Sequence, residues 1–267
     1  MTATFQLAPI LENHPLIREK QDVWLLKVFS PEISKKANPG QFLMIRTSFN
    51  VDPLLPRPFS LCQIHPEKKS VSIVYKTSGP GTTWLSRKKK GELLPVLGPL
   101  GNPFCLPEKA KKIALVGGGI GVTPLISLGE KAFKGKKEIY FFLGLRDKEA
   151  MTVKPSMLSF VSPKRRFFST DNGTFGRKGD IVEHLREFLK RESIDYIAAC
   201  GPKSMLQSLQ RLVVHAGIPA EAAVEEAMAC GLGYCLGCSV AIFKDNQKTY
   251  CLACKDGPIL PLHQLLL

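Results

Sequence analysis

Cysteine placement constrains this chain more than any other feature of its sequence. Eight cysteines occur in 267 residues, and five of them fall within the last 38. A disulfide-stabilised scaffold distributes its cysteines through a small secreted chain. The first residues, MTATFQLAPI, also lack the basic start and apolar core of a secretory signal. The local cluster therefore favours metal ligation in a reducing, cytoplasmic environment.

The spacing within this cluster indicates which metal centre to expect. Cys230, Cys235 and Cys238 form the pattern C-x4-C-x2-C, and Cys254 follows after fifteen further residues. The first three positions have the spacing of plant-type [2Fe–2S] proteins. Glycines between the cysteines would let the loop wrap closely round a cluster, with backbone N–H groups directed at the sulfur atoms.

A structural zinc site is the alternative for the same segment. A zinc ribbon uses two C-x2-C pairs, and Cys235/Cys238 and Cys251/Cys254 are such pairs. The preceding Cys230-Gly-Leu-Gly segment favours the iron–sulfur interpretation. The net charge of +14 would suit a zinc-bearing module that binds nucleic acid, but the chain lacks interleaved aromatic and basic residues.

Three regions are expected along the chain. Residues 1–107 contain short β-rich segments separated by Pro, Gly and Asn, which predicts a small antiparallel barrel or sandwich. Residues 108–220 alternate strand and helix patterns, which predicts a doubly wound parallel α/β sheet. Residues 221–267 form the cysteine-rich region. No continuous apolar run of about 18 residues exists, so no membrane span is expected.

The predicted elements can be placed by residue number. Strands are expected at Val23–Phe29, Gln41–Arg46, Phe59–Gln63, Val71–Tyr75, Ile113–Val116, Glu138–Leu145, Phe167–Thr170 and Tyr196–Ala199, and helices at Thr123–Phe133, Asp180–Arg191 and Ser204–Ala216.

Two segments of the β-rich region are candidates for holding a flavin. Arg57-Pro58-Phe59-Ser60 opens a predicted strand, and an Arg and a Ser beside extended backbone can hold a flavin phosphate and a ring edge. The segment from Gly79 to Leu85 could begin a helix whose N–H groups suit a pyrophosphate. The structural alternative for the first segment is a surface turn with a core Phe, and the alternative for the second is an ordinary helix cap.

Two turns of the α/β region are candidates for holding a dinucleotide. Val116-Gly117-Gly118-Gly119-Ile120-Gly121-Val122-Thr123-Pro124 lies between a strand and a helix, as a dinucleotide-binding turn requires. Cys200-Gly201-Pro202 ends a later strand. Arg146 and Asp147 follow another strand and could contact a ribose or its phosphate. The structural alternatives are close packing for the glycine turn, a buried small cysteine for Cys200, and a solvated turn for Arg146 and Asp147.

Taken together, the motifs resemble the ferredoxin–NADP reductase superfamily, and within it the electron-transfer subunits of NAD-dependent dihydroorotate dehydrogenases. The resemblance covers nearly the whole chain. It is carried by PGQFL at Pro39–Leu43, the RPFS quartet, GPLGN at Gly98–Asn102, the GGGIG turn, Asp171-Asn172-Gly173 with Gly176 and Gly179, Cys200-Gly201-Pro202 with Met205, and Met228-Ala229-Cys230-Gly231.

The resemblance implies site residues and a function. FAD would be held by Arg57, Pro58, Phe59 and Ser60, by Val74, Tyr75 and Lys76, and by Gly81 and Thr82. NAD would be held by Gly118, Gly119, Gly121 and Thr123 and by Cys200, Gly201 and Pro202. A [2Fe–2S] cluster would be bound by Cys230, Cys235, Cys238 and Cys254. No residue of the chain is expected to be catalytic in itself, because the cofactors carry the chemistry.

In this function, electrons pass from the flavin of a dihydroorotate dehydrogenase catalytic subunit, through the cluster and FAD, to NAD+ in pyrimidine biosynthesis. The expected partner is that subunit, in a heterotetramer of two plus two chains without nucleic acid. The alternative enzyme is another NAD(P)H–ferredoxin or hydrogenase-type reductase component. Lys76 stands where the family is expected to carry Arg, which weakens a bidentate phosphate contact.

Overall fold

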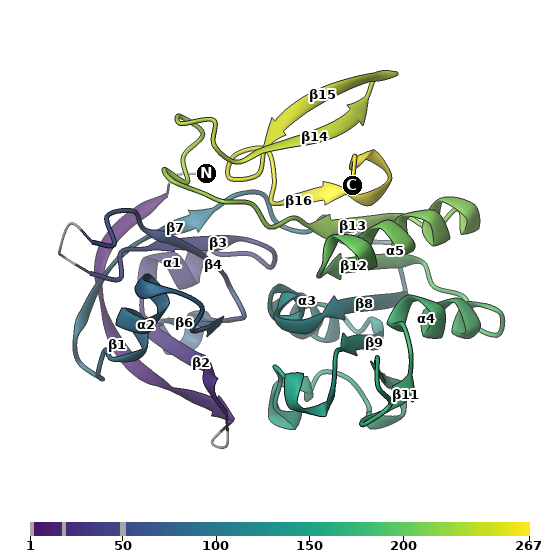
Figure 1. The fold of residues 1–267 in the computed structure, drawn as a ribbon, viewed down its shortest axis with the longest axis horizontal. Coiled ribbons are helices and arrows are strands. Elements are labelled where there is room, and N and C mark those ends of the chain that lie inside the picture. Colours follow the sequence, from purple (N-terminus) through teal and green to yellow (C-terminus); the bar gives the residue numbers. More distant parts are fainter. Residues whose placement is uncertain (1–2, 18–19, 49–51) are drawn as a thin grey trace. The chain divides into compact units, whose positions relative to one another are not determined.

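The computed structural model of the chain describes residues 3–17, 20–48 and 52–267 (Figure 1). By packing, the chain divides into two compact units. Unit 1 comprises Met1–Pro103, Glu225–Val240 and Cys251–Pro258, and unit 2 comprises Phe104–Val224, Ala241–Tyr250 and Ile259–Leu267. The cysteine-rich tail thus contributes to both units. The functional division into residues 1–107, 108–220 and 221–267 stays a prediction.

Unit 1 is built on a seven-stranded antiparallel sheet with the strand order β4-β3-β7-β1-β2-β6-β5. Its strands are β1 Thr4–Ile17, β2 Lys20–Phe29, β3 Phe42–Ile45, β4 Arg57–Ser60, β5 Gln63–His65, β6 Ser70–Lys76 and β7 Leu93–Leu100, and its helices are α1 Pro31–Lys36 and α2 Pro80–Ser86. Although β4 and β6 are far apart in the strand order, the rings of Phe59 and Tyr75 lie 5.8 Å apart. The sheet therefore curls round one apolar core, as the predicted barrel requires.

Unit 2 is built on a seven-stranded sheet with the order β11-β10-β9-β8-β12-β13-β16, parallel except for β16. Its strands are β8 Lys112–Gly118, β9 Glu138–Leu145, β10 Arg166–Thr170, β11 Arg177–Lys178, β12 Tyr196–Cys200, β13 Ala220–Ala223 and β16 Ile259–Pro261, and its helices are α3 Thr123–Lys134, α4 Ile181–Leu189 and α5 Lys203–Ala216. The predicted combination of antiparallel β and parallel α/β structure is confirmed.

The tail adds a hairpin of β14 Ser239–Lys244 and β15 Gln247–Leu252. Its last strand, β16, pairs antiparallel with β13 at the edge of the unit 2 sheet. Among the described residues, no helix combines the length and the apolar character needed to span a bilayer.

Local sequence explains why the unit 2 elements begin and end where they do. The central strands β8 and β9 are buried along nearly their whole length, which accounts for the continuous apolar runs IALV and IYFFL. Helix α4 begins after Asp180, whose carboxylate accepts the Val182 N–H at 2.6 Å. Helix α5 ends at Gly217, which has a φ of +63°.

The packing of α3 against the segment after β9 yields a stability prediction. A Cβ on Gly129 would lie 2.2 Å from Phe160 Cε2. Because this site has no room, we expect Gly129→Ala to lower the free energy of unfolding by about 1–3 kcal/mol, despite the better helix propensity of Ala. Urea denaturation measures this change. The control is Gly135→Ala at the end of the same helix, where the nearest atom lies at 3.4 Å. Equal stability of both variants would contradict the prediction.

Candidate functional site

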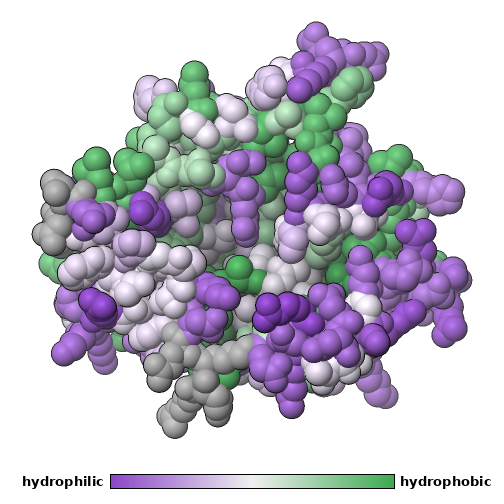
Figure 2. All heavy atoms as spheres, viewed as in Figure 1, coloured by the Kyte–Doolittle hydropathy of each residue, from purple (hydrophilic) through white to green (hydrophobic). Residues whose placement is uncertain are grey.

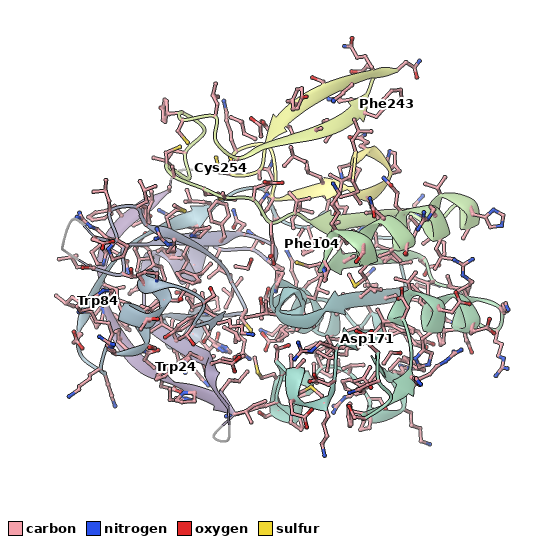
Figure 3. All side chains as sticks on the ribbon, in the orientation of Figure 1. Trp24, Trp84, Phe104, Asp171, Phe243 and Cys254 are labelled. Carbon is pink, nitrogen blue, oxygen red and sulfur yellow. The ribbon has the colours of Figure 1, made fainter. Side chains whose placement is uncertain are left out.

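The four cysteines predicted to ligate iron are brought together in unit 1. Cys230 and Cys235 lie in the loop before β14, Cys238 immediately precedes that strand, and Cys254 lies in the turn after β15 (Figure 3). Cys238 and Cys254 are buried, whereas Cys235 is exposed and Cys230 half-buried. The loop is therefore anchored at two thiols and reaches the surface at the other two.

Backbone groups of the loop stabilise a thiolate at Cys230. The Leu232 N–H donates to Cys230 Sγ at 3.3 Å. Hydrogen bonds from the N–H groups of Leu232, and then of Cys235, lower the pKa of the Cys230 thiol to about 6. The turn requires Gly231, whose φ is +69°. Since the thiolate is the metal-ligating form, the loop is suited to hold a cation before any metal binds.

The second pair of thiols is Cys238 and Cys254. The Cys254 N–H lies 3.5 Å from Cys238 Sγ. Burial, followed by the hydrogen bond with Cys238, raises the pKa of Cys254 to about 12. The charge of Cys230 also acts on this pKa, which places the two pairs within electrostatic range of each other.

Cys251 differs from these four. Burial, followed by the charges of Asp256 and Cys238, raises its pKa, and it lies within β15 rather than in a loop. Of the four thiols, only Cys238 acts on the pKa of Cys251. The pKa of Cys254, by contrast, responds to Cys238 and to Cys230 of the other pair. This supports Cys254 as the fourth ligand, which stays a prediction.

The donor set fits the predicted cluster. Within residues 3–17, 20–48 and 52–267, no three His, Cys, Asp or Glu side chains are arranged to hold one metal ion. The thiols are instead arranged as Cys230 with Cys235 and Cys238 with Cys254. A [2Fe–2S] cluster is bound by four Cys thiolates, and these four thiols would hold it.

The candidate flavin segments also come together in unit 1. Arg57 begins β4, and its Nη1 donates to the Leu55 carbonyl at 2.7 Å. A Cβ on Gly81 of α2 would lie 3.2 Å from Arg57 Nε, so the guanidinium lies directly against the start of that helix. Arg57 and Ser60 remain half-buried, whereas Phe59 packs into the core.

Thr47 is a site residue that the sequence reasoning missed. Its Oγ1 is buried and has no hydrogen-bond partner among the described residues, and it would lie 3.3 Å from a Cβ on Gly81. A buried hydroxyl without a partner is uncommon in native structures. A ligand oxygen beside Arg57 and Gly81 would satisfy it, so these residues fit a phosphate-bearing cofactor. No motif in the sequence marks Thr47, which lies two residues beyond β3.

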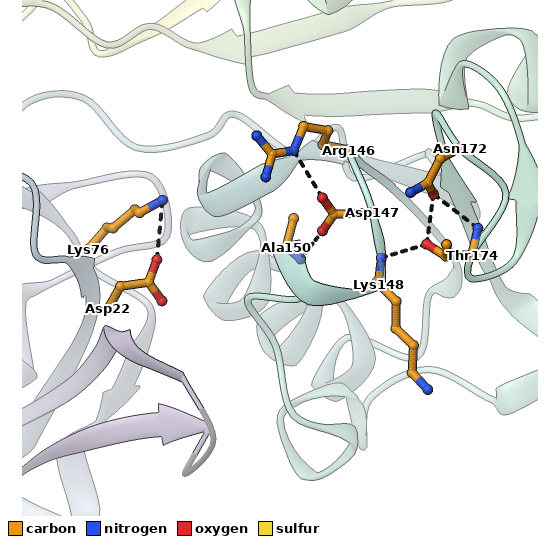
Figure 4. A network of polar contacts seen from close by, with 8 residues as sticks. All are labelled: Asp22, Lys76, Arg146, Asp147, Lys148, Ala150, Asn172 and Thr174. Carbon is orange, nitrogen blue, oxygen red and sulfur yellow. Dashed lines mark hydrogen bonds and ion pairs between the residues drawn. The ribbon is translucent and has the colours of Figure 1, made fainter.

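The remaining flavin candidates have mixed roles. Val74 and Tyr75 are buried in β6, and the Tyr75 hydroxyl donates to Asn13 Oδ1 at 3.0 Å. Burial raises the Tyr75 pKa well above its ordinary value. Lys76 is exposed and pairs with Asp22 at 3.3 Å (Figure 4). The Thr82 hydroxyl donates to the Gly79 carbonyl and accepts from its N–H, at 3.1 and 3.2 Å.

The candidate nicotinamide residues lie at the carboxyl ends of two neighbouring strands in unit 2. Strands β8 and β12 are paired in register up to Gly117 and Cys200. A Cβ on Gly121 would lie 2.9 Å from the Cα of Gly201, and a Cβ on Gly118 would lie 2.5 Å from Pro202 Cδ. The two turns thus pack backbone to backbone.

This is also where the strand order reverses, since β9 and β10 follow β8 on one side and β12 and β13 follow on the other. Ligands of open α/β sheets bind at such a switch point. Cys200 is fully buried, as is Thr123 at the start of α3.

A polar network fixes the loops after β9 and β10 (Figure 4). The Asp147 carboxylate accepts the Ala150 N–H at 2.8 Å and pairs with Arg146 at 3.0 Å. The Lys148 N–H donates to Thr174 Oγ1 at 2.9 Å. The Arg146 side chain is 84% exposed, so its guanidinium remains accessible to an anion. Contact of Arg146 or Asp147 with a ribose stays a prediction.

Two sequence-family models match the chain. Residues 225–266 match the iron–sulfur cluster binding domain of dihydroorotate dehydrogenase B. Residues 115–211 match the oxidoreductase NAD-binding domain. These two ranges contain the four candidate cluster thiols and both candidate dinucleotide turns.

Solved structures share the fold. One structure of an NADH-dependent reduced ferredoxin-NADP oxidoreductase, described in a study of flavin-based electron bifurcation, aligns over 97% of this chain and 90% of its own, with a TM-score of 0.83 and 27% identity. The cytochrome b5 reductase domain of Ulva prolifera nitrate reductase covers 80% of this chain and 94% of its own, with a TM-score of 0.66 and 18% identity. The second likeness concerns the fold alone.

Three curated relatives that cover nearly the whole chain are dihydroorotate dehydrogenase B (NAD(+)) electron transfer subunits. The subunit from Desulforamulus reducens is 31% identical over 92% of this chain and 93% of its own. That from Caldanaerobacter subterraneus subsp. tengcongensis is 37% identical over 87% and 88%, and that from Geobacillus sp. is 33% identical over 96% and 98%. The chain therefore belongs to the family of dihydroorotate dehydrogenase B (NAD(+)) electron transfer subunits.

Proposed function

We propose that this chain conveys electrons from the flavin of a dihydroorotate dehydrogenase catalytic subunit to NAD+ in pyrimidine biosynthesis. It does so with a [2Fe–2S] cluster and FAD as its own cofactors. One observation carries the proposal: the cysteine loop is seated on the same barrel that holds the candidate flavin residues.

Several contacts fix this loop on the barrel. A Cβ on Gly231 would lie 2.6 Å from Met44 Cγ of β3. The Asn102 amide donates to the Asp256 carbonyl at 2.8 Å, and the Asn102 N–H to the Gly257 carbonyl at 2.6 Å. Because these contacts lie within one unit, the thiols and the flavin residues keep a constant relationship to each other.

When bound, FAD couples the one-electron chemistry of an iron–sulfur cluster to the hydride chemistry of nicotinamide, and the protein supplies placement and electrostatics. Arg57 and the Thr47 hydroxyl bind and orient phosphate oxygens, and Arg57 compensates their charge. In unit 2, the close-packed turns at Gly121 and Gly201 lie at the strand ends, where the pyrophosphate of a dinucleotide binds in such sheets.

The proposed partner is the flavin-containing catalytic subunit, in an assembly of two plus two chains in the cytoplasm. The family is one of electron transfer subunits, so the substrate is oxidised elsewhere in the complex.

Anaerobic purification with cofactor extraction tests the proposal. We expect one FAD and two irons per chain, because one barrel and four candidate thiols are present. Mixing with the catalytic subunit, dihydroorotate and NAD+ should then produce NADH, followed by its absorbance. Each subunit alone is the control. Zinc without flavin, or no NADH in the reconstituted complex, would contradict the proposal.

A second candidate is a reductase that exchanges electrons between NAD(P)H and ferredoxin. The 27% identity and TM-score of 0.83 to an NADH-dependent ferredoxin-NADP oxidoreductase favour it. Reduced ferredoxin as the electron donor distinguishes the two functions, since only this candidate predicts faster NAD(P)+ reduction with ferredoxin than with the catalytic subunit and dihydroorotate.

A further inference from the structure

Unit 2 contains a cavity that none of the candidate cofactor residues lines. It has a volume of about 430 Å³ and lies between helix α4 and the strands β10 and β11. One lining residue comes from β10, one from β11, and five from α4 and the turn after it. Pockets of roughly 300–1,000 Å³ take small molecules, so the cavity has room for one small ligand.

Aromatic rings form one wall of the cavity. The Phe167 ring stacks on Phe142 of β9, which is fully buried, with the ring centroids 4.6 Å apart. His184 and Phe188 meet Phe167 edge to face at 5.4 and 5.2 Å. Because the three lining rings are only half-buried, part of their surface remains for a ligand. A planar aromatic ring packs against such a wall by offset or edge-to-face contact.

Two arginines line the same cavity and form no salt bridge in the part of the chain that the structure describes. They are Arg177 of β11 and Arg191 after α4, and both are exposed. The hydrogen bond from Lys190 lowers the pKa of Glu187, and the charges of both arginines add to this effect, so the two guanidinium groups lie within electrostatic range of one carboxylate. Figure 2 shows hydrophilic residues along the right edge, where Figure 1 draws α4.

The two carboxylates of the lining are already engaged by lysines. Glu187 accepts a hydrogen bond from Lys190 Nζ at 2.7 Å, and Glu192 accepts one from Lys112 Nζ at 2.9 Å. Neither lysine lines the cavity. Each acid thus has a cation of its own, and the charges of the two arginines are left uncompensated. The cavity therefore favours an anion.

His184 adds a neutral ring rather than a further charge. Its Nδ1 lies 3.2 Å from the hydroxyl of Ser169, which is fully buried. Burial, followed by the charge of Arg177, lowers the pKa of His184, so the imidazole is neutral at pH 7. The wall of rings and the pair of arginines are thus distinct halves of the cavity, one for an aromatic group and one for an anion.

We propose that this cavity binds a nucleoside monophosphate, with the base against the rings of Phe167, His184 and Phe188 and the phosphate between Arg177 and Arg191. Arginine presents a planar fork of donors that matches phosphate oxygens, and two such groups suit a dianionic phosphate. The volume lies near the lower end of the range for small-molecule pockets, which fits one base and one sugar rather than a dinucleotide.

The proposed site is separate from the candidate dinucleotide residues. Those residues lie at the ends of β8 and β12, whereas the cavity lies beside β10 and β11. In the order of the sheet, β9 and β10 stand between β8 and β11. We therefore expect the monophosphate to bind while NAD+ is bound, as a ligand that does not take part in electron transfer.

Titration calorimetry of the full-length, cofactor-loaded chain with uridine monophosphate tests the inference. Saturating NAD+ is present throughout, so that the dinucleotide site is filled. Uridine and inorganic phosphate each lack one half of the proposed contacts, and we expect both to bind at least about tenfold more weakly. Uridine monophosphate that binds no more tightly than inorganic phosphate would overturn the assignment, as would tighter binding of a uridine oligonucleotide.

Variants of the two arginines locate the site. Arg177→Leu/Arg191→Leu should weaken binding of uridine monophosphate at least about tenfold, because hydrogen bonds to a charged group are lost. Arg177→Lys/Arg191→Lys keeps the charge without the fork and should lose less. The matched control is Arg186→Leu on the same helix, since Arg186 pairs with Glu183 at 3.0 Å and does not line the cavity. It should bind as the unaltered chain does.

Two results would show that the inference is wrong: no binding of uridine monophosphate to the unaltered chain, or equal binding by the Leu double variant and Arg186→Leu. Should the double variant lose FAD or iron, hydrogen exchange on the unaltered chain replaces it. Protection of amides 177–192 by uridine monophosphate then supports the site, and protection confined to residues 117–123 and 200–203 overturns it. NADH production by the reconstituted complex plays no part in these measurements, so the proposed function is tested separately.

Discussion

Cys254→Ser is expected to lose at least nine-tenths of the bound iron, whereas Cys251→Ser keeps it. Cys254 is the thiol whose pKa responds both to Cys238 and to Cys230, so removing it breaks one of the two pairs. A serine hydroxyl is a poor replacement for a thiolate at iron. The pKa of Cys251 is raised by burial and by the charges of Asp256 and Cys238, with no contribution from Cys230, and Cys251 lies within a strand.

Iron analysis and the visible spectrum of both variants, purified without oxygen, measure the difference. The two cysteines lie three positions apart in sequence, so Cys251→Ser is a matched control for general damage to the tail. Iron loss in Cys251→Ser with retention in Cys254→Ser would reverse the ligand assignment. Equal loss in both would favour the zinc-ribbon spacing, in which both thiols of the second pair bind metal.

Arg57→Leu is expected to weaken FAD binding by about 10- to 100-fold, which corresponds to the roughly 1.5–3 kcal/mol of a hydrogen bond to a charged group. The guanidinium lies against Gly81, next to the Thr47 hydroxyl, which has no hydrogen-bond partner in the part of the chain that the structure describes. Without it, the phosphate charge would be left uncompensated beside a buried hydroxyl. Arg57→Lys should recover part of the affinity, since it restores the charge but not the planar fork of donors.

Recovery of flavin fluorescence on dissociation measures this affinity. Arg87→Leu is the control, because Arg87 lies at the end of the same helix α2 and contacts the Trp84 ring at 5.7 Å instead of the candidate pocket. If Arg57→Leu retained FAD as well as Arg87→Leu does, the phosphate of the cofactor would have to be held elsewhere.

Sequence patterns were sufficient to predict strands that are buried along their whole length. They were also sufficient to predict a metal site where the cysteines have the spacing of a known metal centre. The runs IALV and IYFFL predicted β8 and β9, and the helix expected from Thr123 is α3. The C-x4-C-x2-C spacing anticipated three of the four thiols that the fold brings together. In each case the information lies within a dozen residues, so it can be read without knowing the rest of the fold.

Other elements could not be predicted, for physical reasons. Strands β1 and β7 escaped prediction because each contains two prolines, at 9 and 15 and at 95 and 99, and proline is a signal against a strand interior. The strand expected at Phe59–Gln63 is divided between β4 and β5. Thr47 has no motif of its own, since only the three-dimensional approach of Gly81 and Arg57 reveals its buried hydroxyl.

The tail that alternates between the two units has a consequence for biosynthesis. Unit 1 is completed only by residues 251–258, so a ribosome must have synthesised both sheets except β16 before Cys254, the last predicted iron ligand, emerges. The barrel strands are therefore made long before the thiols that bind iron, and a version shortened after residue 224 would leave Met44 without the cover of Gly231.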